Sequence, residues 1–472
     1  MLNNKELAFT PAWKLQQLIF SKEISPVELT ELYFERINSL NSKLNAYLTL
    51  NYDDALKSAK SAETEIINDN ILGPLHGIPI AIKDMEPTQG LRTTLGSLTL
   101  DKNIPDKDSI MVEKIKKSGA IILGKTNTSE FGAIGTCENN LGPPCKNPWD
   151  TTKTSGGSSG GSAAAIASGM AAITSGGDGG GSIRIPASYC GTYGIKPTQG
   201  RVAKYSATPN WIAQNGPITR TVKDAAFLLQ TISGYHKDDK YSVQKKVPDF
   251  LEYLKKDLKN LRIGWSSDFG HIPVSKEVEN ITSEAAKKFE SFGCSVEKTE
   301  FKIEQWAWDS WWTTHNAHAY SNNGKLLESN PYQLTWYYKR CLKLGKSITG
   351  EAYGNALKQR TALITQFEKI FEKFDLILSP TMPDTAFSIE NYPEKINNTQ
   401  LFPDPWYGTI QFTHPINTIG NPAASIPCGL TSNNMPVGLH IIGRPWDEIT
   451  ILAASAAFEQ SYPWADTIAP IS

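Results

Sequence analysis

An excess of charge of one sign is missing from this 472-residue sequence. Its 47 Lys and Arg residues balance 48 Asp and Glu residues, so the formal net charge is -1. Such a balance provides no electrostatic basis for binding nucleic acid or an anionic membrane surface. We therefore expect neither nucleic acid nor a membrane among the partners of this protein.

Long hydrophobic runs are missing as well. The most apolar internal stretch, Ser162 to Thr174, is Ala-rich and shorter than the roughly 20 apolar residues that cross a bilayer. Residues 1–20 are amphipathic and lack the apolar core and small-residue cleavage pattern of a secretory signal. We therefore expect no transmembrane segment and interpret the chain as a cytoplasmic protein.

Cysteine is scarce. The six cysteines are scattered, with no C-x-x-C pair and no histidine at metal-ligand spacing, so neither disulfides nor a zinc site is expected. Cys190 lies close to the glycine-rich segment described below. A small buried hydrophobic residue is a commoner role for such a cysteine than a reactive thiol.

Short apolar runs alternate with helical periods along much of the chain. Patterns typical of strands occur at Ile78–Ile82, Ala120–Leu123, Ala172–Thr174, Tyr193–Ile195, 375–379 and Val437–Ile442, and helical patterns at Ser25–Leu40, 53–66, Ser109–Lys117 and Ile449–Glu459. Asp108 is the expected N-cap of the third helix and Gly119 its expected stop. The alternation predicts an α/β fold in which helices cover both faces of a sheet.

We expect one domain over residues 1–472, with a core at about 70–235 and 375–472 and a helical, aromatic-rich insertion at about 240–375. The segment Phe301–Leu342 in this insertion contains five of the chain's twelve tryptophans. The tryptophans of Trp306–Trp312 fit the wall of an apolar pocket, but their mixed helical spacing fits packing in a core at least as well.

Glycine is concentrated in residues 154–181, where it makes up ten of 28 positions. A flexible Gly/Ser linker is one explanation, but the string SAAAIASGMAA that follows is typical of a buried helix. A phosphate-binding loop requires a lysine and Ser or Thr after the last glycine, or an acidic residue downstream of G-x-G-x-x-G. The string GGSSGGSA contains no such lysine, which disfavours nucleotide binding.

The string DGGGSIR, residues 178–184, favours acyl transfer instead. Glycines allow successive backbone N–H groups to converge on one point, here those of Gly179, Gly180, Gly181 and Ser182. Negative charge develops on a carbonyl oxygen when a serine hydroxyl adds to the carbonyl carbon, and such N–H groups stabilise this charge. Ser182 is therefore the candidate nucleophile.

A serine nucleophile requires a base. All seven histidines lie outside the segment Gly77–Tyr235, which weakens the usual candidate, although folding can still bring one of them in. Lys83 ends a predicted strand, where α/β folds commonly place their sites. Because burial disfavours the charged form of lysine, a buried Lys83 can act as a base near neutral pH.

These residues together closely resemble the amidase signature family. The dense match spans residues 75–201 and comprises GIPIAIKD, GKTNTSEFGA, GGSSGGSAAAIASG and GGDGGGSIRIPASYCGTYGIKPTQGR; looser features lie in DLILSPTMP and INTIGNPAASIPCGL. The resemblance implies an α/β fold with a large mixed sheet. It also implies hydrolysis of the C–N bond of a carboxylic amide without a metal or organic cofactor.

The resemblance assigns roles by position. It implies a catalytic triad of Ser182 as nucleophile, Ser158 as a bridging serine with a cis peptide bond, and Lys83 as base. The oxyanion hole maps to the backbone of Gly179, Gly180, Gly181 and Ser182, and supporting roles map to Asp178, Arg184 and Ser159.

Three functional classes remain to be weighed. The first is a free-standing amidohydrolase of a small, apolar linear or cyclic amide, since GGDGGGSIRIPAS is similar to hydrolases of the 6-aminohexanoate cyclic dimer type. The second is the amidase subunit of a tRNA-dependent amidotransferase, which usually reads GSDTGGSIRQPA; this chain has Ile185 in place of Gln, and the departure favours the free-standing enzyme. A non-catalytic binding protein would require a broken triad, and all three positions are intact. The sequence leaves a homodimer open.

Overall fold

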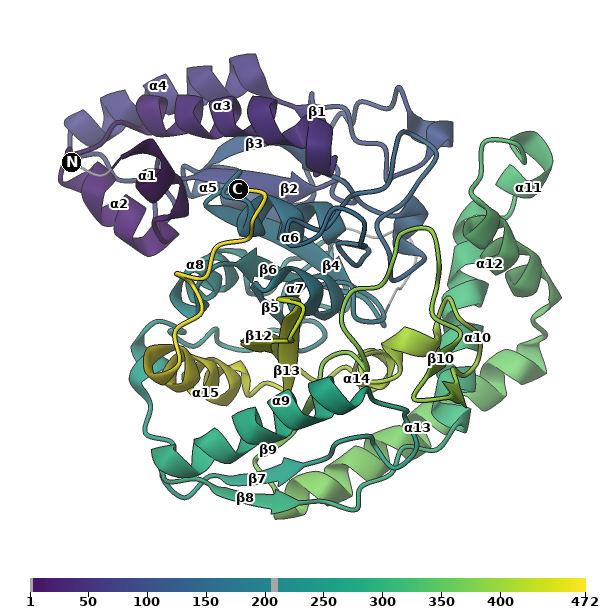
Figure 1. Cartoon of the computed structure of the whole chain (residues 1–472). Helices are drawn as coiled ribbons and strands as arrows, with labels where there is room; N and C mark the ends of the chain where they lie inside the picture. Colours follow the sequence, from purple (N-terminus) through teal and green to yellow (C-terminus); the bar gives the residue numbers. More distant parts are fainter. Residues whose placement is uncertain (1–2, 205–210) are drawn as a thin grey trace.

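One 11-stranded sheet runs through the structure, a computed structural model that describes residues 3–204 and 211–472 (Figure 1). Its strands are β1 (Tyr47–Leu50), β2 (Pro79–Lys83), β3 (Ile121–Thr126), β4 (Ile173–Asp178), β5 (Tyr193–Lys196), β6 (Gln214–Thr219), β7 (Arg262–Trp265), β8 (Ser295–Lys298), β9 (Leu376–Pro380), β12 (Ala423–Leu430) and β13 (Pro436–Gly443). They lie in the order β1-β3-β2-β4-β6-β5-β12-β13-β9-β7-β8. The remaining strands, β10 (Lys395–Ile396) and β11 (Thr399–Gln400), pair only with each other.

The sheet is mixed. Strand β2 pairs in parallel with β3 and β4, and β7 pairs in parallel with β8 and β9. The pairs between these two groups, and the pair of β1 with β3, are antiparallel. The predicted α/β class with a large mixed sheet is confirmed.

Helices pack around this sheet. They are α1 (Asn4–Phe9), α2 (Ala12–Phe20), α3 (Pro26–Leu44), α4 (Tyr52–Ile67), α5 (Ile110–Lys117), α6 (Gly160–Ala167), α7 (Arg184–Cys190), α8 (Val222–Ile232), α9 (Lys276–Lys287), α10 (Trp306–Asn323), α11 (Leu326–Ser329), α12 (Trp336–Ser347), α13 (Gly350–Lys373), α14 (His414–Ile419) and α15 (Glu448–Ser461). Figure 1 shows α10, α12 and α13 gathered on the side of the molecule away from the N-terminal helices. No helix in the described ranges is long and apolar enough to cross a membrane.

The start of α5 differs from the expectation. Its N-cap is Ser109, whose hydroxyl accepts a hydrogen bond from the Val112 N–H at 3.3 Å. Asp108, the expected cap, instead accepts the Gln89 N–H at 2.7 Å and pairs with Lys116 at 2.8 Å. Both side chains are good caps, so the tertiary partner of Asp108 decides between them.

The region 240–375 is only partly helical. It contains the helical group α10–α13, but also β7 and β8, which extend the main sheet beyond β9. The first half of this region is thus mixed, with helix α9 between β7 and β8, and its second half is helical. Strand β8 lies at the edge of the sheet and is mostly exposed, so no run of buried apolar residues marks it in the sequence.

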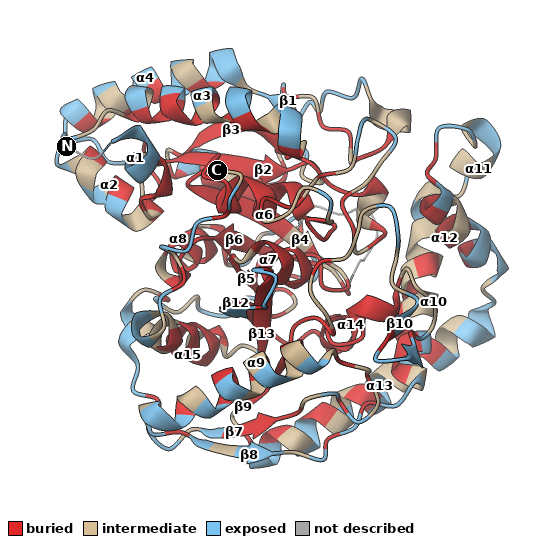
Figure 2. Cartoon of the chain, in the orientation of Figure 1, coloured by how far each residue is buried: buried red, intermediate tan, exposed pale blue. Residues whose placement is uncertain are grey.

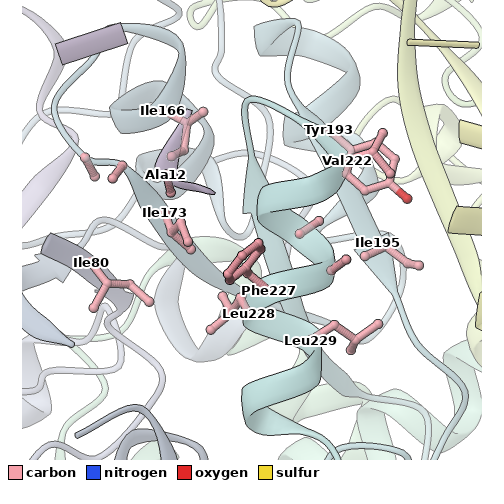
Figure 3. Close-up of a cluster of buried hydrophobic side chains, with 14 of the residues drawn as sticks. Ala12, Ile80, Ile166, Ile173, Tyr193, Ile195, Val222, Phe227, Leu228 and Leu229 are labelled. Atoms are coloured by element: carbon pink, nitrogen blue, oxygen red, sulfur yellow. The ribbon is translucent and has the colours of Figure 1, made fainter. Parts of the chain in front are cut away.

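A buried apolar cluster lies where helices meet β2, β4 and β5. Figure 3 shows Phe227 and Leu228 of α8 on the side of Ile80 and Ile173, and Leu229 on the side of Ile195. Burial is also high on the strands and helices that follow the glycine-rich segment, and every residue of α6 and α7 is buried (Figure 2). The elements that hold the candidate catalytic residues are thus packed on all sides.

Glycine is required at position 161 of α6 by packing. A Cβ atom there would lie 2.3 Å from the Asn127 nitrogen and 2.4 Å from the Ala46 oxygen, both backbone atoms. At Gly354 of α13, by contrast, a Cβ atom would meet nothing within 4 Å. The two glycines therefore sit in opposite environments although both are helical.

We expect Gly161→Ala to lower the free energy of unfolding by about 1–3 kcal/mol or more, because overpacked buried backbone must shift. Gly354→Ala serves as the control and should raise it by up to about 1 kcal/mol, because alanine has the higher helix propensity. Urea denaturation followed by circular dichroism measures both changes. Equal shifts for the two variants would contradict the packing argument.

Candidate active site

A cavity of about 270 Å³ lies at the end of β2 and β4. Lys83, Ser158 and Ser182 all line it, so the structure brings together the three residues of the expected triad. The other lining residues are Met85, Glu86, Pro87, Ser109, Phe131, Gly132, Ala133, Ile134, Gly135, Gly177, Asp178, Gly179, Gly180, Ile185, Lys204, Ile212, Ala213, Asn215, Trp311, His315, Tyr407 and Ile410.

Lys83 is the last residue of β2, and its side chain is buried. Its Nζ atom donates to the Oγ atom of Ser158 at 2.7 Å and to the carbonyl oxygen of Gly177 at 3.1 Å. Burial lowers the pKa of Lys83 to about 7, against the opposing influence of Cys137, Asp178 and Glu86. Neutral and charged forms of this amine therefore coexist near neutral pH.

Ser158 follows Gly157 through a cis peptide bond, as the resemblance implied. The backbone of Thr136 fits closely against this turn, since a Cβ atom at Gly157 would lie 1.9 Å from the Thr136 oxygen. Ser158 and Ser182 line the same cavity but form no hydrogen bond with each other in the described part of the chain. Catalytic hydrogen bonds are often long in a site without substrate and shorten when substrate binds.

The turn after β4 is held through its carbonyl groups. The carbonyl of Asp178 accepts from Asn417 Nδ2 at 2.8 Å, that of Gly179 from Trp311 Nε1 at 2.8 Å, and that of Gly181 from the Ile185 N–H at 2.7 Å. In a trans peptide the N–H points away from the C=O.

Those three carbonyl bonds fix the directions of the N–H groups of Gly179, Gly180 and Ser182. None of the three donates to another described residue, so all are available to a negatively charged oxygen in the cavity. Gly181 differs from the other expected donors, because its N–H donates to Asp178 Oδ1 at 2.7 Å.

The carboxylate of Asp178 holds this turn by accepting several hydrogen bonds. Arg184 donates to it through Nε and Nη2 at 3.0 Å each, and the Ile183 N–H and Asn417 Nδ2 bind it as well. Burial alone would raise the pKa of Asp178, but Arg184 holds it well below its usual range. The ion pair is fully buried, so the Asp178 carboxylate stays charged near neutral pH.

The other two supporting residues also contact the turn. The Ser159 N–H donates to the Ser182 carbonyl at 3.2 Å, and its hydroxyl lies 3.3 Å from the backbone of Gly177. Arg184 extends further, to His440 Nε2 at 3.0 Å and Asn417 Oδ1 at 2.6 Å. Asp178 and Arg184 thus form a buried pair next to Ser182, and Ser159 contacts the same turn separately.

One histidine reaches the cavity. His315 of α10 lines it and stacks on the Trp311 ring with centroids 4.9 Å apart, and burial lowers its pKa to about 4. It makes no hydrogen bond to Ser158 or Ser182 within the described ranges. The described residues also contain no group of three or more side chains that could hold a metal ion.

The rest of the cavity lining is of two kinds. Its apolar part includes Phe131, Ile134, Ile185, Ile212, Trp311, Tyr407 and Ile410. Its charged part, apart from Lys83 and Asp178, includes Lys204 and Glu86, and Glu86 Oε1 accepts from Asn215 Nδ2 at 2.8 Å. A ligand beside Ser182 thus meets both apolar side chains and polar groups, as is usual in small-molecule sites.

Sequence reasoning missed several of these residues. Thr413, Asn417 and Ile410 lie far along the chain, and only Asn417 belonged to a quoted family string, INTIGNPAASIPCGL. Trp311 was noticed as part of a tryptophan cluster, with core packing and a pocket wall both open. The structure places Trp308 and Trp311 in one buried cluster, and of the two Trp311 also lines the cavity.

Comparison with known proteins agrees with this geometry. The sequence model of the amidase family matches residues 28–452. The chain belongs to the amidase family. The predicted resemblance and enzyme class are therefore confirmed, and this protein is an amidase, a hydrolase of C–N amide bonds.

Relatives of this amidase fall into two groups. Among curated proteins, a glutamyl-tRNA(Gln) amidotransferase subunit of Moorella thermoacetica is 37% identical, with 97% of each chain covered. Among solved structures, a bacterial aryl acylamidase of the amidase signature family superposes with a TM-score of 0.91 at 30% identity, covering 98% of this chain and 99% of the other.

Two further structures extend this picture. A 6-aminohexanoate cyclic dimer hydrolase with bound substrate has a TM-score of 0.89 at 26% identity, covering 98% of this amidase and 99% of that chain. The same amidotransferase subunit from Thermotoga maritima has a TM-score of 0.74 at 31% identity, covering 93% and 92%. Sequence identity and overall shape thus favour different relatives.

We expect Arg184→Met to destabilise the amidase by roughly 3–5 kcal/mol, because it leaves the Asp178 charge buried without its partner. The matched control is Arg262→Met, which breaks a half-exposed pair with Asp375 and should cost much less, because solvent screens this pair. Guanidinium denaturation of the two variants compares the losses. A loss for Arg184→Met no larger than that of the control would contradict the role of the buried pair.

Proposed function

We propose that this amidase forms an acyl-enzyme on Ser182, with Ser158 and Lys83 carrying the proton. The observation that supports this best is the 2.7 Å hydrogen bond from Lys83 Nζ to Ser158 Oγ inside the cavity that Ser182 lines. Because burial lowers the pKa of Lys83 to about 7, the amine is partly neutral and can accept a proton.

The chemistry proceeds in two halves. Neutral Lys83 accepts a proton from Ser158, Ser158 accepts one from Ser182, and Ser182 Oγ adds to the amide carbon. The N–H groups of Gly179, Gly180 and Ser182 stabilise the resulting oxyanion. The relay then returns the proton to the amide nitrogen, the C–N bond breaks, and amine or ammonia leaves. Water attacks the acyl-enzyme by the same relay and releases the acid.

The substrate that the cavity suits best is a small amide with an apolar acyl group. Four isoleucines, Ile134, Ile185, Ile212 and Ile410, line the space around Ser182. Contact with these side chains removes apolar surface from water, which favours aliphatic or aryl acyl groups. The close superposition with an aryl acylamidase and a cyclic dimer hydrolase supports the same class of substrate. We propose that such a substrate is processed without partner subunits.

A second candidate is the glutamine-hydrolysing subunit of a tRNA-dependent amidotransferase. Eight curated relatives with 36–38% identity bear that subunit's name, which supports this candidate more directly than the first. Glu86 and Lys204 are charged side chains on the cavity wall that would lie near the ammonium and carboxylate of glutamine. Against it stands the apolar surface at Ile185 and Ile410, since charged groups are costly to bury without partners.

A panel of amides distinguishes the two candidates. We expect the purified chain to hydrolyse hexanamide, 4-nitroacetanilide or a cyclic diamide with kcat/KM at least about tenfold above that for glutamine, since apolar contact contributes about this much per one or two methylenes. Ser182→Ala should lose about a thousandfold or more. Activity of Ser182→Ala at the level of the unsubstituted protein would overturn the mechanism. A preference for glutamine, with partner proteins that copurify, would select the second candidate.

The pH dependence tests the base. We expect kcat/KM to fall about tenfold per pH unit below about pH 7, because protonated Lys83 cannot accept a proton. Lys196 is the matched control: it is also buried with a pKa lowered to about 7, but it does not line the cavity. Lys83→Met should abolish activity, whereas Lys196→Met should keep the acid limb. Loss of this limb in Lys196→Met would contradict the assignment.

A further inference from the structure

We infer that Trp311 is a positioning residue for the oxyanion hole and that it couples the acyl-binding wall to the rate of catalysis. This inference rests on the proposed function. Trp311 lies on α10 in region 240–375, far from the glycine-rich segment in sequence, and it touches the turn after β4 directly. It is one member of the tryptophan cluster whose role the sequence leaves open.

The contact is specific. The indole Nε1–H of Trp311 donates to the carbonyl oxygen of Gly179 at 2.8 Å. This carbonyl and the N–H of Gly180 belong to one planar peptide group and point in opposite directions. The indole hydrogen bond therefore sets the direction of the Gly180 N–H, one of the three unengaged donors that line the cavity.

The ring also packs against the same peptide. A Cβ atom at Gly180 would lie 2.6 Å from Cζ2 of Trp311, so the ring occupies the space that any larger residue would need. Trp311 is buried and stacks on His315, with ring centroids 4.9 Å apart and an interplanar angle of 10°. Trp308 packs on it as well, at a centroid distance of 5.2 Å. These contacts leave the indole little freedom to turn away from Gly179.

The other hydrogen bonds to the turn come from elsewhere. Thr413 Oγ1 donates to the Gly180 carbonyl at 2.6 Å, and Asn417 holds the Asp178 carbonyl at 2.8 Å; both belong to the segment before β12. Among the carbonyl bonds described above, that of Trp311 is the one made from region 240–375. Helix α10 is thereby connected to the donor geometry at Ser182.

Trp311 also lines the cavity. An acyl group that packs on its ring touches the residue that orients the Gly180 N–H. Because this donor acts on the transition state, displacement of the ring changes kcat more than it changes KM. The fit of the acyl group to Trp311 is then part of the catalytic step and not of binding alone.

A probe that needs no knowledge of the substrate tests this. An alkyl fluorophosphonate reacts with an activated serine: Ser182 Oγ bonds to phosphorus, fluoride leaves, and the relay takes the hydroxyl proton. The labelling rate is measured by intact-mass spectrometry. The key variant carries at position 311 the tryptophan analogue with sulfur in place of the indole nitrogen, which keeps the ring shape and removes the N–H.

We expect this analogue and Trp311→Phe to label about 10- to 100-fold more slowly, since loss of one oxyanion donor costs roughly two to three powers of ten and misorientation costs less. The pH dependence of labelling should stay unchanged, because Lys83 is untouched. Trp312→Phe is the matched control; it alters the neighbouring ring, which does not line the cavity, and should label at the unaltered rate.

The outcomes separate the inference from the function. Labelling of Ser182→Ala, or failure of the unsubstituted protein to react, would overturn the proposed function and the inference with it. If Ser182→Ala is not labelled while the sulfur analogue is labelled at the full rate, only the role of Trp311 is overturned. A rate for Trp312→Phe as low as that of the sulfur analogue would likewise overturn it, because general loss of packing would then suffice.

Discussion

The carboxylate of Asp178 is the constraint on which the site depends. It stands at the end of β4 and binds the side chains of Arg184 and Asn417 together with the N–H groups of Gly181 and Ile183. A charge buried this deeply is tolerated only when it is paired and hydrogen-bonded throughout. Its bonds hold the turn, the start of α7 and the helix α14 in one arrangement, so the donors beside Ser182 are oriented before a substrate arrives.

Desolvation gives the second chemical property of the site. A lysine in water is charged at neutral pH, but the packed strands around Lys83 remove its water and lower its pKa to about 7. His315, which does reach the cavity, stacks on a tryptophan ring. In the proposed mechanism Lys83 takes the place of a histidine, because the burial that stabilises the fold also leaves its amine partly neutral.

Sequence patterns predicted the elements better than their partners. The strand ending at Lys83 and the buried helix after GGSSGG were expected close to where they lie, because local periodicity and glycine content specify them. The sequence predicted Asp108 as the cap of α5, but Ser109 is the cap. Both residues are suitable caps, and the contact of Asp108 with Gln89, which is distant in sequence, decides between them. Strand β8 was not predicted, because it lies at the edge of the sheet and its mostly exposed residues form no apolar run.

The sequence by itself determined the family, the α/β class and the run of glycines before Ser182, because each depends on patterns of residues that are close together in the chain. Only the tertiary structure decided which side chains form hydrogen bonds with these glycines. Trp311 and Thr413 lie more than a hundred residues from Gly179 and Gly180, and only the folded chain brings their donors to those carbonyls. Glycine permits many backbone directions, so the direction of each N–H is a property of long-range contacts that a local pattern does not contain.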